Sequence, residues 1–99
     1  MSEITLHLSI HELCEYEEIS QDSIYAMVEY GIVDPIDGKS VSDWIFDLDS
    51  AHWIKKAVRL NQQMQIDWLA TAMVIDLLRQ KEQLKKENDQ LKARLNRLL

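Results

Sequence analysis

The chain opens with alternating apolar and polar residues and then changes to helical spacing. The alternation in "ITLHL" predicts a short, half-buried strand. Ser9 and Glu12 then form the pattern of a capping box, and an apolar stripe behind them predicts a brief first helix. Ser20 is the expected N-cap of a second helix, which ends where Gly31 can adopt the left-handed conformation. Two short helices joined by so few residues are typical of a helix-turn-helix.

The central stretch predicts a β-wing followed by a third helix. We expect "IVDP" and "VSDWIF" to form a small antiparallel pair joined around "DG", with Pro35 at an edge or turn because it cannot donate to a ladder. The third helix, in "DLDSAHWIKKAVRLNQQ", is expected to start at Asp47 or Asp49. A break at "MQID" follows, and Asp67 is the expected N-cap of the last helix.

The last helix changes character along its length. From Ile66 to Leu78 it is apolar on nearly every side, which predicts that one face packs on its own domain and another on a second chain. Beyond Leu78 its apolar residues are mainly leucines spaced by seven, the pattern of a coiled coil with Asn88 at an a position. We therefore expect a homodimer through this helix, formed by Val74, Leu77, Leu78, Leu84, Asn88, Leu91, Leu95 and Leu98.

Charge is distributed unevenly along the chain, whose formal net charge is −6. Residues 1–54 hold twelve Asp or Glu and one Lys or Arg, whereas residues 55–99 hold five and ten. The predicted wing carries a single basic residue, Lys39. Because binding to nucleic acid requires cations that replace the phosphate counterions, the N-terminal part should repel nucleic acid. We expect a basic protein partner and no direct contact with nucleic acid.

The residue types that usually carry catalysis or bind metals do not form a recognisable site. His11 and Cys14 are three apart on one predicted helix, with His7 nearby, but a tetrahedral metal site wants a fourth ligand. Two glycines cannot build a Gly-rich phosphate loop, and no nucleophile turn motif is present. We therefore expect no enzyme activity, no cofactor, no metal and no small-molecule substrate. The lone cysteine, with no pattern of a secretory signal or a membrane span, predicts a cytoplasmic protein.

The order of elements resembles the MerR-type winged-helix regulators. The similarity is carried by "YGIVDP", which resembles the superfamily's turn into the wing, and by the stretch from "WIFD" to "LATAMVIDLL". It implies a mostly α (α+β) fold with a winged helix-turn-helix at residues 1–65 and a long coiled-coil helix at residues 66–99. DNA-binding members place arginine in the helix-turn-helix and wing, where this chain has acidic or apolar residues. Asn88 favours a parallel dimer, whereas this resemblance favours an antiparallel one.

A narrower resemblance covers nearly the whole chain. The ordered set "TLHLSIHELC", "GIVDP", "KKAVRL" and "LKKENDQLKARLNRLL" is similar to the CbpM-type chaperone modulators. That resemblance implies a small protein without enzymatic activity that binds the J domain of CbpA, a DnaJ-like co-chaperone that also binds curved DNA. It implies that binding blocks coupling of the J domain to Hsp70 and can also reduce the DNA binding of the partner. The alternative is a MerR-like transcription regulator that itself binds DNA.

A basic J domain is expected to contact the acidic N-terminal part of the chain. Clustered carboxylates would speed encounter, and aromatic residues among them would supply most of the affinity. For any one carboxylate, a solvated surface charge is the favoured interpretation, whereas the cluster as a whole favours a partner. The candidate partner-binding residues are Glu15, Tyr16, Glu17, Glu18, Asp22, Tyr25, Glu29, Asp34, Asp37, Asp43 and Trp44.

Overall fold

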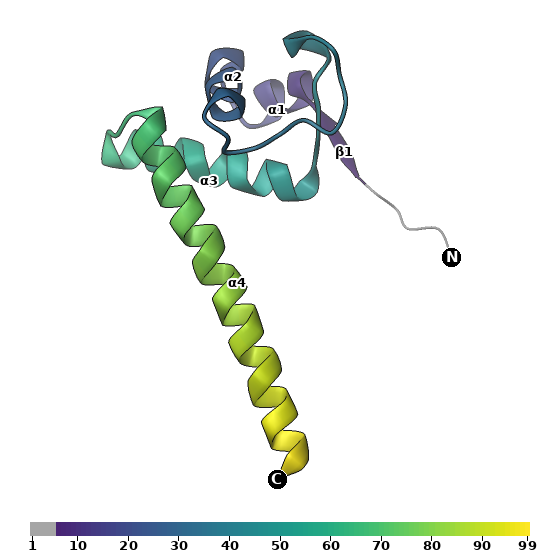
Figure 1. Ribbon diagram of the computed structural model, residues 1–99. Coiled ribbons are helices and arrows are strands. Elements are labelled where there is room, and N and C mark those ends of the chain that lie inside the picture. Colours follow the sequence, from purple (N-terminus) through teal and green to yellow (C-terminus); the bar gives the residue numbers. More distant parts are fainter. Residues whose placement is uncertain (1–5) are drawn as a thin grey trace.

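The computed structural model describes residues 6–99, except for the side chain of Tyr16, so that Ile4 and Thr5 of the expected first strand lie outside the described residues. A small head contains the short elements, and one long helix projects from it (Figure 1). The predicted mostly α fold with a small sheet is confirmed. The elements in order are β1 (His7–Ser9), α1 (Ile10–Tyr16), α2 (Gln21–Glu29), the 3-10 helix η1 (Val41–Asp43), β2 (Ile45–Asp47), α3 (Leu48–Met64) and α4 (Trp68–Leu98).

Side chains at the starts of the α-helices satisfy backbone N–H groups that have no partner within the helix. At α1 the Ser9 hydroxyl accepts a hydrogen bond from the Glu12 N–H at 3.2 Å, and the Glu12 carboxylate accepts one from the Ser9 N–H at 3.3 Å. Ser20 caps α2 in the same position. Asp47 and Asp67 cap α3 and α4, each accepting from the N–H three residues further on at 2.8 Å. The predicted N-caps are therefore confirmed, and the third helix starts directly after Asp47.

The end of α2 confirms the predicted role of Gly31. This residue has a φ of +76°, a left-handed conformation that glycine adopts without steric cost. Its N–H donates to the Val28 carbonyl at 3.1 Å, and the Ile32 N–H donates to the Met27 carbonyl at 2.8 Å. These two bonds form a Schellman motif, which ends the helix. The chain then turns inward, so that Ile32 and Val33 are buried.

The predicted pairing of "IVDP" with "VSDWIF" is wrong. β2 pairs instead with β1 in an antiparallel two-stranded sheet, in which Leu8 lies opposite Phe46. The strand predicted from "ITLHL" is thus confirmed within the described residues, at His7–Ser9. The segment before β2 contacts it, in the part of the chain that the structure describes, through one isolated bridge between Asp37 and Ile45. The wing is reduced to this bridge and the turn that follows it.

Local hydrogen bonds explain why the first half of the expected wing strand is a turn. Val41–Asp43 forms the 3-10 helix η1, in which the Asp43 N–H donates to the Ser40 carbonyl at 2.9 Å. The Ser40 hydroxyl also donates to the Asp43 carboxylate at 2.9 Å. Such side-chain bonds compete with a strand ladder, and Pro35 removes a donor from the opposite segment. Gly38 has a φ of +108°, and a Cβ there would overlap the Asp43 carbonyl, so this turn requires glycine.

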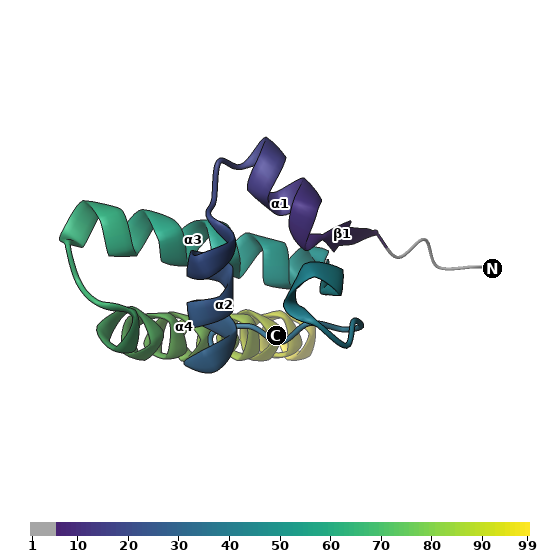
Figure 2. The same cartoon turned by 90° about the horizontal axis from the view of Figure 1, so that it is seen from above.

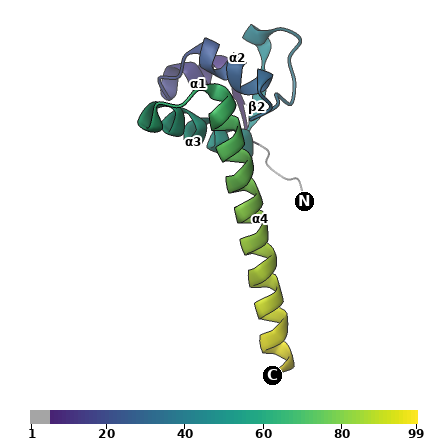
Figure 3. The ribbon, with the colours of Figure 1, turned by 60° about the vertical axis from the view of Figure 1, so that its left-hand side comes forward.

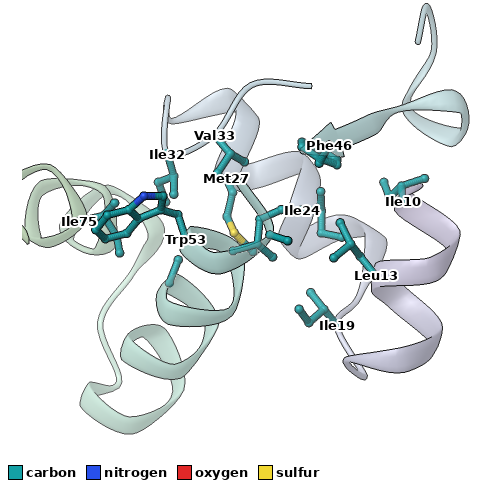
Figure 4. Close-up of a cluster of buried hydrophobic side chains, with 13 residues drawn as sticks. Ile10, Leu13, Ile19, Ile24, Met27, Ile32, Val33, Phe46, Trp53 and Ile75 are labelled. Carbon is teal, nitrogen blue, oxygen red and sulfur yellow. The ribbon is translucent and has the colours of Figure 1, made fainter. Parts of the chain in front are cut away.

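The core is built from α1, α2 and α3 together with β2 and the first turns of α4 (Figure 4). Trp53 on α3 is 4% exposed and therefore lies in this core. Trp44 and Trp68 are half-buried and pack against the same cluster. The head and the start of the long helix therefore share one apolar core. Its buried members are Ile10, Leu13, Ile19, Ile24, Met27, Ile32, Val33, Phe46, Ala51, Trp53, Ile54, Ala57 and Ile75.

Helix α4 changes its surroundings along its length. Its first turns pack on α3 and α2 (Figure 2). Thr71 and Ile75, which lie in these turns, are fully buried. At the edge of this contact Lys56 lies 5.4 Å and Arg79 lies 4.9 Å from the centre of the Trp53 ring. From residue 81 onward every residue is exposed, and this part extends away from the head (Figure 3). The division into domains at residues 65 and 66 stays a prediction.

Candidate partner-binding surface

The candidate partner-binding residues are divided among three parts of the head. All eight of their carboxylates are exposed. The side chain of Tyr16 lies outside the described residues. The end of α1 and the following turn carry Glu15, Glu17 and Glu18; α2 carries Asp22, Tyr25 and Glu29; and the segment between α2 and β2 carries Asp34, Asp37, Asp43 and Trp44.

The outer face of α2 brings three of these residues together. Asp22, Tyr25 and Glu29 are spaced by three and four residues, and side chains with this spacing are neighbours on a helix. Ile24 and Met27 on the opposite side are fully buried in the core. The rotation of α2 is therefore fixed by its packing, and this packing turns two carboxylates and one tyrosine toward solvent.

An aromatic pair joins this face to the segment before β2. The Tyr25 and Trp44 rings are stacked, with centroids 6.1 Å apart and an interplanar angle of 6°. Trp44 in turn meets the Phe46 ring edge-on, with centroids 6.3 Å apart and an angle of 83°. Phe46 is fully buried, whereas Tyr25 is 48% exposed. We call Tyr25 and Trp44 the aromatic platform, in which Tyr25 is exposed, Trp44 is half-buried, and both are held in place by the core.

Near the end of α1, one acidic residue forms an ion pair, unlike the carboxylates on α2. The Lys55 ammonium lies 2.9 Å from the Glu17 carboxylate, so that one of these charges already has a cationic neighbour from α3. Glu18 follows with a φ of +54°, a left-handed conformation that directs the chain from α1 toward α2. Glu15 is exposed on α1. The net negative charge of the surface around Glu17 is therefore smaller than the sequence alone indicates.

The carboxylates between α2 and β2 have structural partners within their own segment. Asp37 accepts a hydrogen bond from the Gly38 N–H at 2.8 Å, and Asp43 accepts one from the Ser40 hydroxyl at 2.9 Å. Asp34 is exposed in the same segment. Because Asp37 and Asp43 shape the turn, they are poorer candidates for a partner contact than the carboxylates on α2.

A second exposed surface lies along α4, on the side turned away from the head. Val74 and Leu78 are half-buried, and Leu78 packs against the core, so that these two are only partly available. Two further exposed residues, Leu69 at 57% and Met73 at 64%, extend the stripe toward the head and were missed by heptad spacing alone. Leu69, Met73 and Leu77 follow one another at four-residue intervals, and this spacing is the signal that finds them. The remaining predicted dimerisation residues are all exposed: Leu77, Leu84, Asn88, Leu91, Leu95 and Leu98.

Comparison with known proteins supports the resemblance inferred from the sequence. The chain matches the family model described as "MerR HTH family regulatory protein" over residues 8–93. It is also similar to proteins named chaperone modulatory protein CbpM. The one from Pseudomonas putida is 34% identical over 98 residues, covering 99% of this chain and 96% of the relative. The one from Pseudomonas entomophila is 35% identical over 96 residues, covering 97% of this chain and 94% of the relative.

A more distant relative extends the match. The CbpM protein of Citrobacter koseri is 31% identical over 99 residues, covering 100% of this chain and 97% of the relative. The chain belongs to the CbpM family. In this chain a helix-turn-helix scaffold presents two carboxylates and Tyr25 on α2, with Trp44 stacked beside Tyr25. This surface can bind a basic or aromatic group, whereas duplex DNA would require cations.

Two titratable groups outside this surface, Asp47 and Cys14, have shifted pKa values that the structure explains. The pKa of Asp47 is lowered, chiefly because the Ser50 N–H donates to its carboxylate, as expected for an N-cap. Burial raises the pKa of Cys14, which packs half-buried against the core and is therefore a poor nucleophile. Among residues 6–99, no three His, Cys, Asp or Glu side chains are grouped so that they could hold a metal ion. Over the same residues, no helix combines the length and apolarity that crossing a membrane requires.

Proposed function

We propose that this chain modulates a chaperone system by binding the J domain of a DnaJ-like, CbpA-type co-chaperone. The proposal is supported by relatives that match nearly the full chain and are named chaperone modulatory proteins. Binding would block coupling of the J domain to Hsp70 and would also reduce the DNA binding of the co-chaperone. The chain would act in the cytoplasm by occupancy alone, without catalysis, cofactor or metal.

The observation that carries this proposal is the outer face of α2. A helix-turn-helix protein that binds DNA needs cations on its exposed helices to replace phosphate counterions. Here Asp22 and Glu29 lie in that position, on either side of the exposed Tyr25 ring. Charge of this sign favours encounter with a basic surface, and the aromatic platform supplies apolar area to bury in a complex.

Competition for one basic surface would explain inhibition. A J domain is expected to present a basic helix, beside its His-Pro-Asp loop, to an acidic surface of Hsp70. An acidic head that covers that helix would exclude Hsp70 from it. Because both contacts would be electrostatically steered, the association rate should fall as salt rises.

We also propose that two copies associate through α4. The support is the stripe of exposed leucines, which are 62–65% exposed at Leu77, Leu84 and Leu91. A helix that projects from its domain with such a stripe gains stability by burying it against a second helix. The region from Leu69 to Leu77 would lengthen the contact beyond the heptads and would help a short coiled coil to form.

NMR titration of the isotopically labelled full chain with an isolated J domain tests the proposed contact. We expect the largest shifts at backbone amides of α2 and at the Trp44 indole, with saturable binding that Hsp70 competes away. Shifts confined to the exposed part of α4 would refute the head as the binding surface. Absence of any binding would refute the proposed function as a whole.

The alternative function, a DNA-binding regulator, is kept because the matched family is described as regulatory. It predicts retention of duplex DNA in a gel shift at low salt, with a steep loss of affinity as salt is raised. We expect no retention by this chain under conditions in which it captures a J domain. Retention without J-domain capture would favour the alternative.

A further inference from the structure

The aromatic platform and its two neighbouring carboxylates form one small surface. Tyr25 is the central residue, because Asp22 lies three positions before it and Glu29 four positions after it on α2. We propose that this surface is a binding site for an arginine side chain carried on a basic helix of the partner. The inference rests on the proposed function in taking the partner to be a basic protein, and it names the group that the partner must supply.

The chemistry of a guanidinium group matches both parts of this surface. A guanidinium is planar and stacks on an aromatic face, and it also donates paired hydrogen bonds to a carboxylate. A lysine ammonium is a compact, strongly hydrated charge that cannot form the same paired bonds while stacking. Cβ atoms three or four residues apart on a helix are about 5–6 Å from one another, so a group stacked on Tyr25 would be within reach of Asp22 or Glu29.

The surface is already ordered before any partner arrives. Trp44 stacks on Tyr25 at an interplanar angle of 6° and is itself held edge-on by the fully buried Phe46. Rings fixed in this way lose little conformational freedom on binding, which favours affinity. Within residues 6–99, the ion pairs are Lys55 with Glu17 and Lys56 with Glu82, so neither carboxylate on α2 is engaged by a cation.

Other exposed groups of the head lack this combination. Tyr30 is as exposed as Tyr25, at 47%, but among the described residues it stacks on no other ring. Glu17 has its cation, Lys55, already in place. One internal competitor exists, since the C-terminal half of α4 carries arginine and a second copy could present it. The experiment therefore includes an outcome that assigns the site to that occupant.

The test uses two synthetic amphipathic helical peptides that differ only in having arginine or lysine at every basic position. Binding to the full chain is measured by calorimetry at low salt, and the Trp44 indole is followed by NMR. We expect the arginine peptide to bind about tenfold more tightly, which corresponds to about 1.4 kcal/mol, because only a guanidinium can stack on the ring and form paired hydrogen bonds with a carboxylate at the same time. The preference should be lost in Tyr25→Leu and kept in Tyr25→Phe.

Matched variants separate the platform from general exposure and charge. Tyr30→Leu removes an equally exposed tyrosine elsewhere and should keep the arginine preference. The double variant of Asp22→Asn with Glu29→Gln should lose it, whereas Asp76→Asn with Asp89→Asn, which changes the net charge equally at two exposed carboxylates outside the candidate partner-binding residues, should keep it. Equal affinity for both peptides, no binding of either, or a preference that survives Tyr25→Leu would overturn the proposal.

Two further readouts assign the result. If the Trp44 indole signal of the chain alone changes on dilution, the site is occupied by a second copy, and the proposal of a partner arginine is overturned. J-domain capture is measured in parallel with the same variants. Capture that is unaffected by Tyr25→Leu overturns the arginine site and leaves the proposed function standing, whereas arginine preference without any J-domain capture supports the site and refutes the proposed function.

Discussion

Replacing Ile75 with alanine tests whether side-chain packing anchors α4 to the head. Ile75 is fully buried and belongs to the same core cluster as Trp53 (Figure 4). The change removes three methyl or methylene groups at about 0.8 kcal/mol each, and a residual cavity adds to this loss. We expect the free energy of unfolding to fall by about 3 kcal/mol. For a domain of this length the melting temperature should fall by roughly 12–24 °C.

Urea unfolding followed by circular dichroism, at two protein concentrations, measures this loss. The control is Leu84→Ala on the same helix, where the side chain is 65% exposed. Ile75→Ala should lose stability at both concentrations, whereas Leu84→Ala should matter only where copies associate. If Ile75→Ala lowered the free energy of unfolding by less than about 1 kcal/mol, the tight packing of this side chain would be refuted, because truncating a buried isoleucine in a rigid core destabilises a protein by more than this.

Three further predictions concern pH, salt and the arrangement of two copies. Asp47→Ala should destabilise the chain by about 1 kcal/mol at neutral pH, because it removes an N-cap. Since the folded-state pKa of Asp47 is lowered, this contribution is present above the unfolded pKa of about 3.9 and is lost as pH falls through the folded pKa. Urea unfolding curves of the two proteins should therefore converge in acid. Stopped-flow association with a J domain should slow several-fold between about 0.05 and 0.5 M salt, and an unchanged rate would refute electrostatic steering. Leu98→Cys in a Cys14→Ser background should form a disulfide-linked dimer under mild oxidation only if the two helices are parallel, because an antiparallel pair keeps the two C-termini apart.

Short-range signals predicted the helix ends well. Ser9 and Glu12 bond within a single turn, and the conformation of Gly31 depends on carbonyls only a few residues away. Interactions of this kind are set by residues that are close in sequence, so their pattern can be recognised without knowing the fold. The same is true of Asp67, which starts α4.

Strand pairing could not be predicted in this way. Alternation of apolar and polar residues indicates a strand but does not say which other strand it joins. The nearest segment in sequence was the natural partner for β2, yet β1 from the start of the chain takes that place. Pro35 and the turn bonds of Ser40 exclude the nearer pairing, and their combined effect becomes evident only when the hydrogen bonds are seen.

The sequence predicted which kinds of residue form the candidate site but not how they are arranged in space. The sequence indicates that the N-terminal part is acidic, but the contacts between Glu17 and Lys55 and between Tyr25 and Trp44 join residues far apart in the chain. Only these tertiary contacts separate the carboxylates on α2 from those that are paired or that shape a turn. Whether the α2 face meets a J domain stays a prediction, as does dimerisation through α4.

Lys56 and Arg79 contact the Trp53 ring close to the point where α4 leaves the head, so a change in this contact would tilt the whole projecting part of the helix. The Lys56 ammonium on α3 also lies 3.7 Å from the Glu82 carboxylate on α4. Among the ion pairs of the described residues, this is the one furthest along α4 that joins the helix to the head. The residues beyond it extend for about 25 Å at 1.5 Å per residue. A tilt of about ten degrees at this contact would move the tip by roughly 4 Å, about three-quarters of the rise of one helical turn. If two copies join through α4, as proposed above, weakening a single cation–indole contact would therefore alter how far apart the two heads are held, without changing any residue of the α2 face.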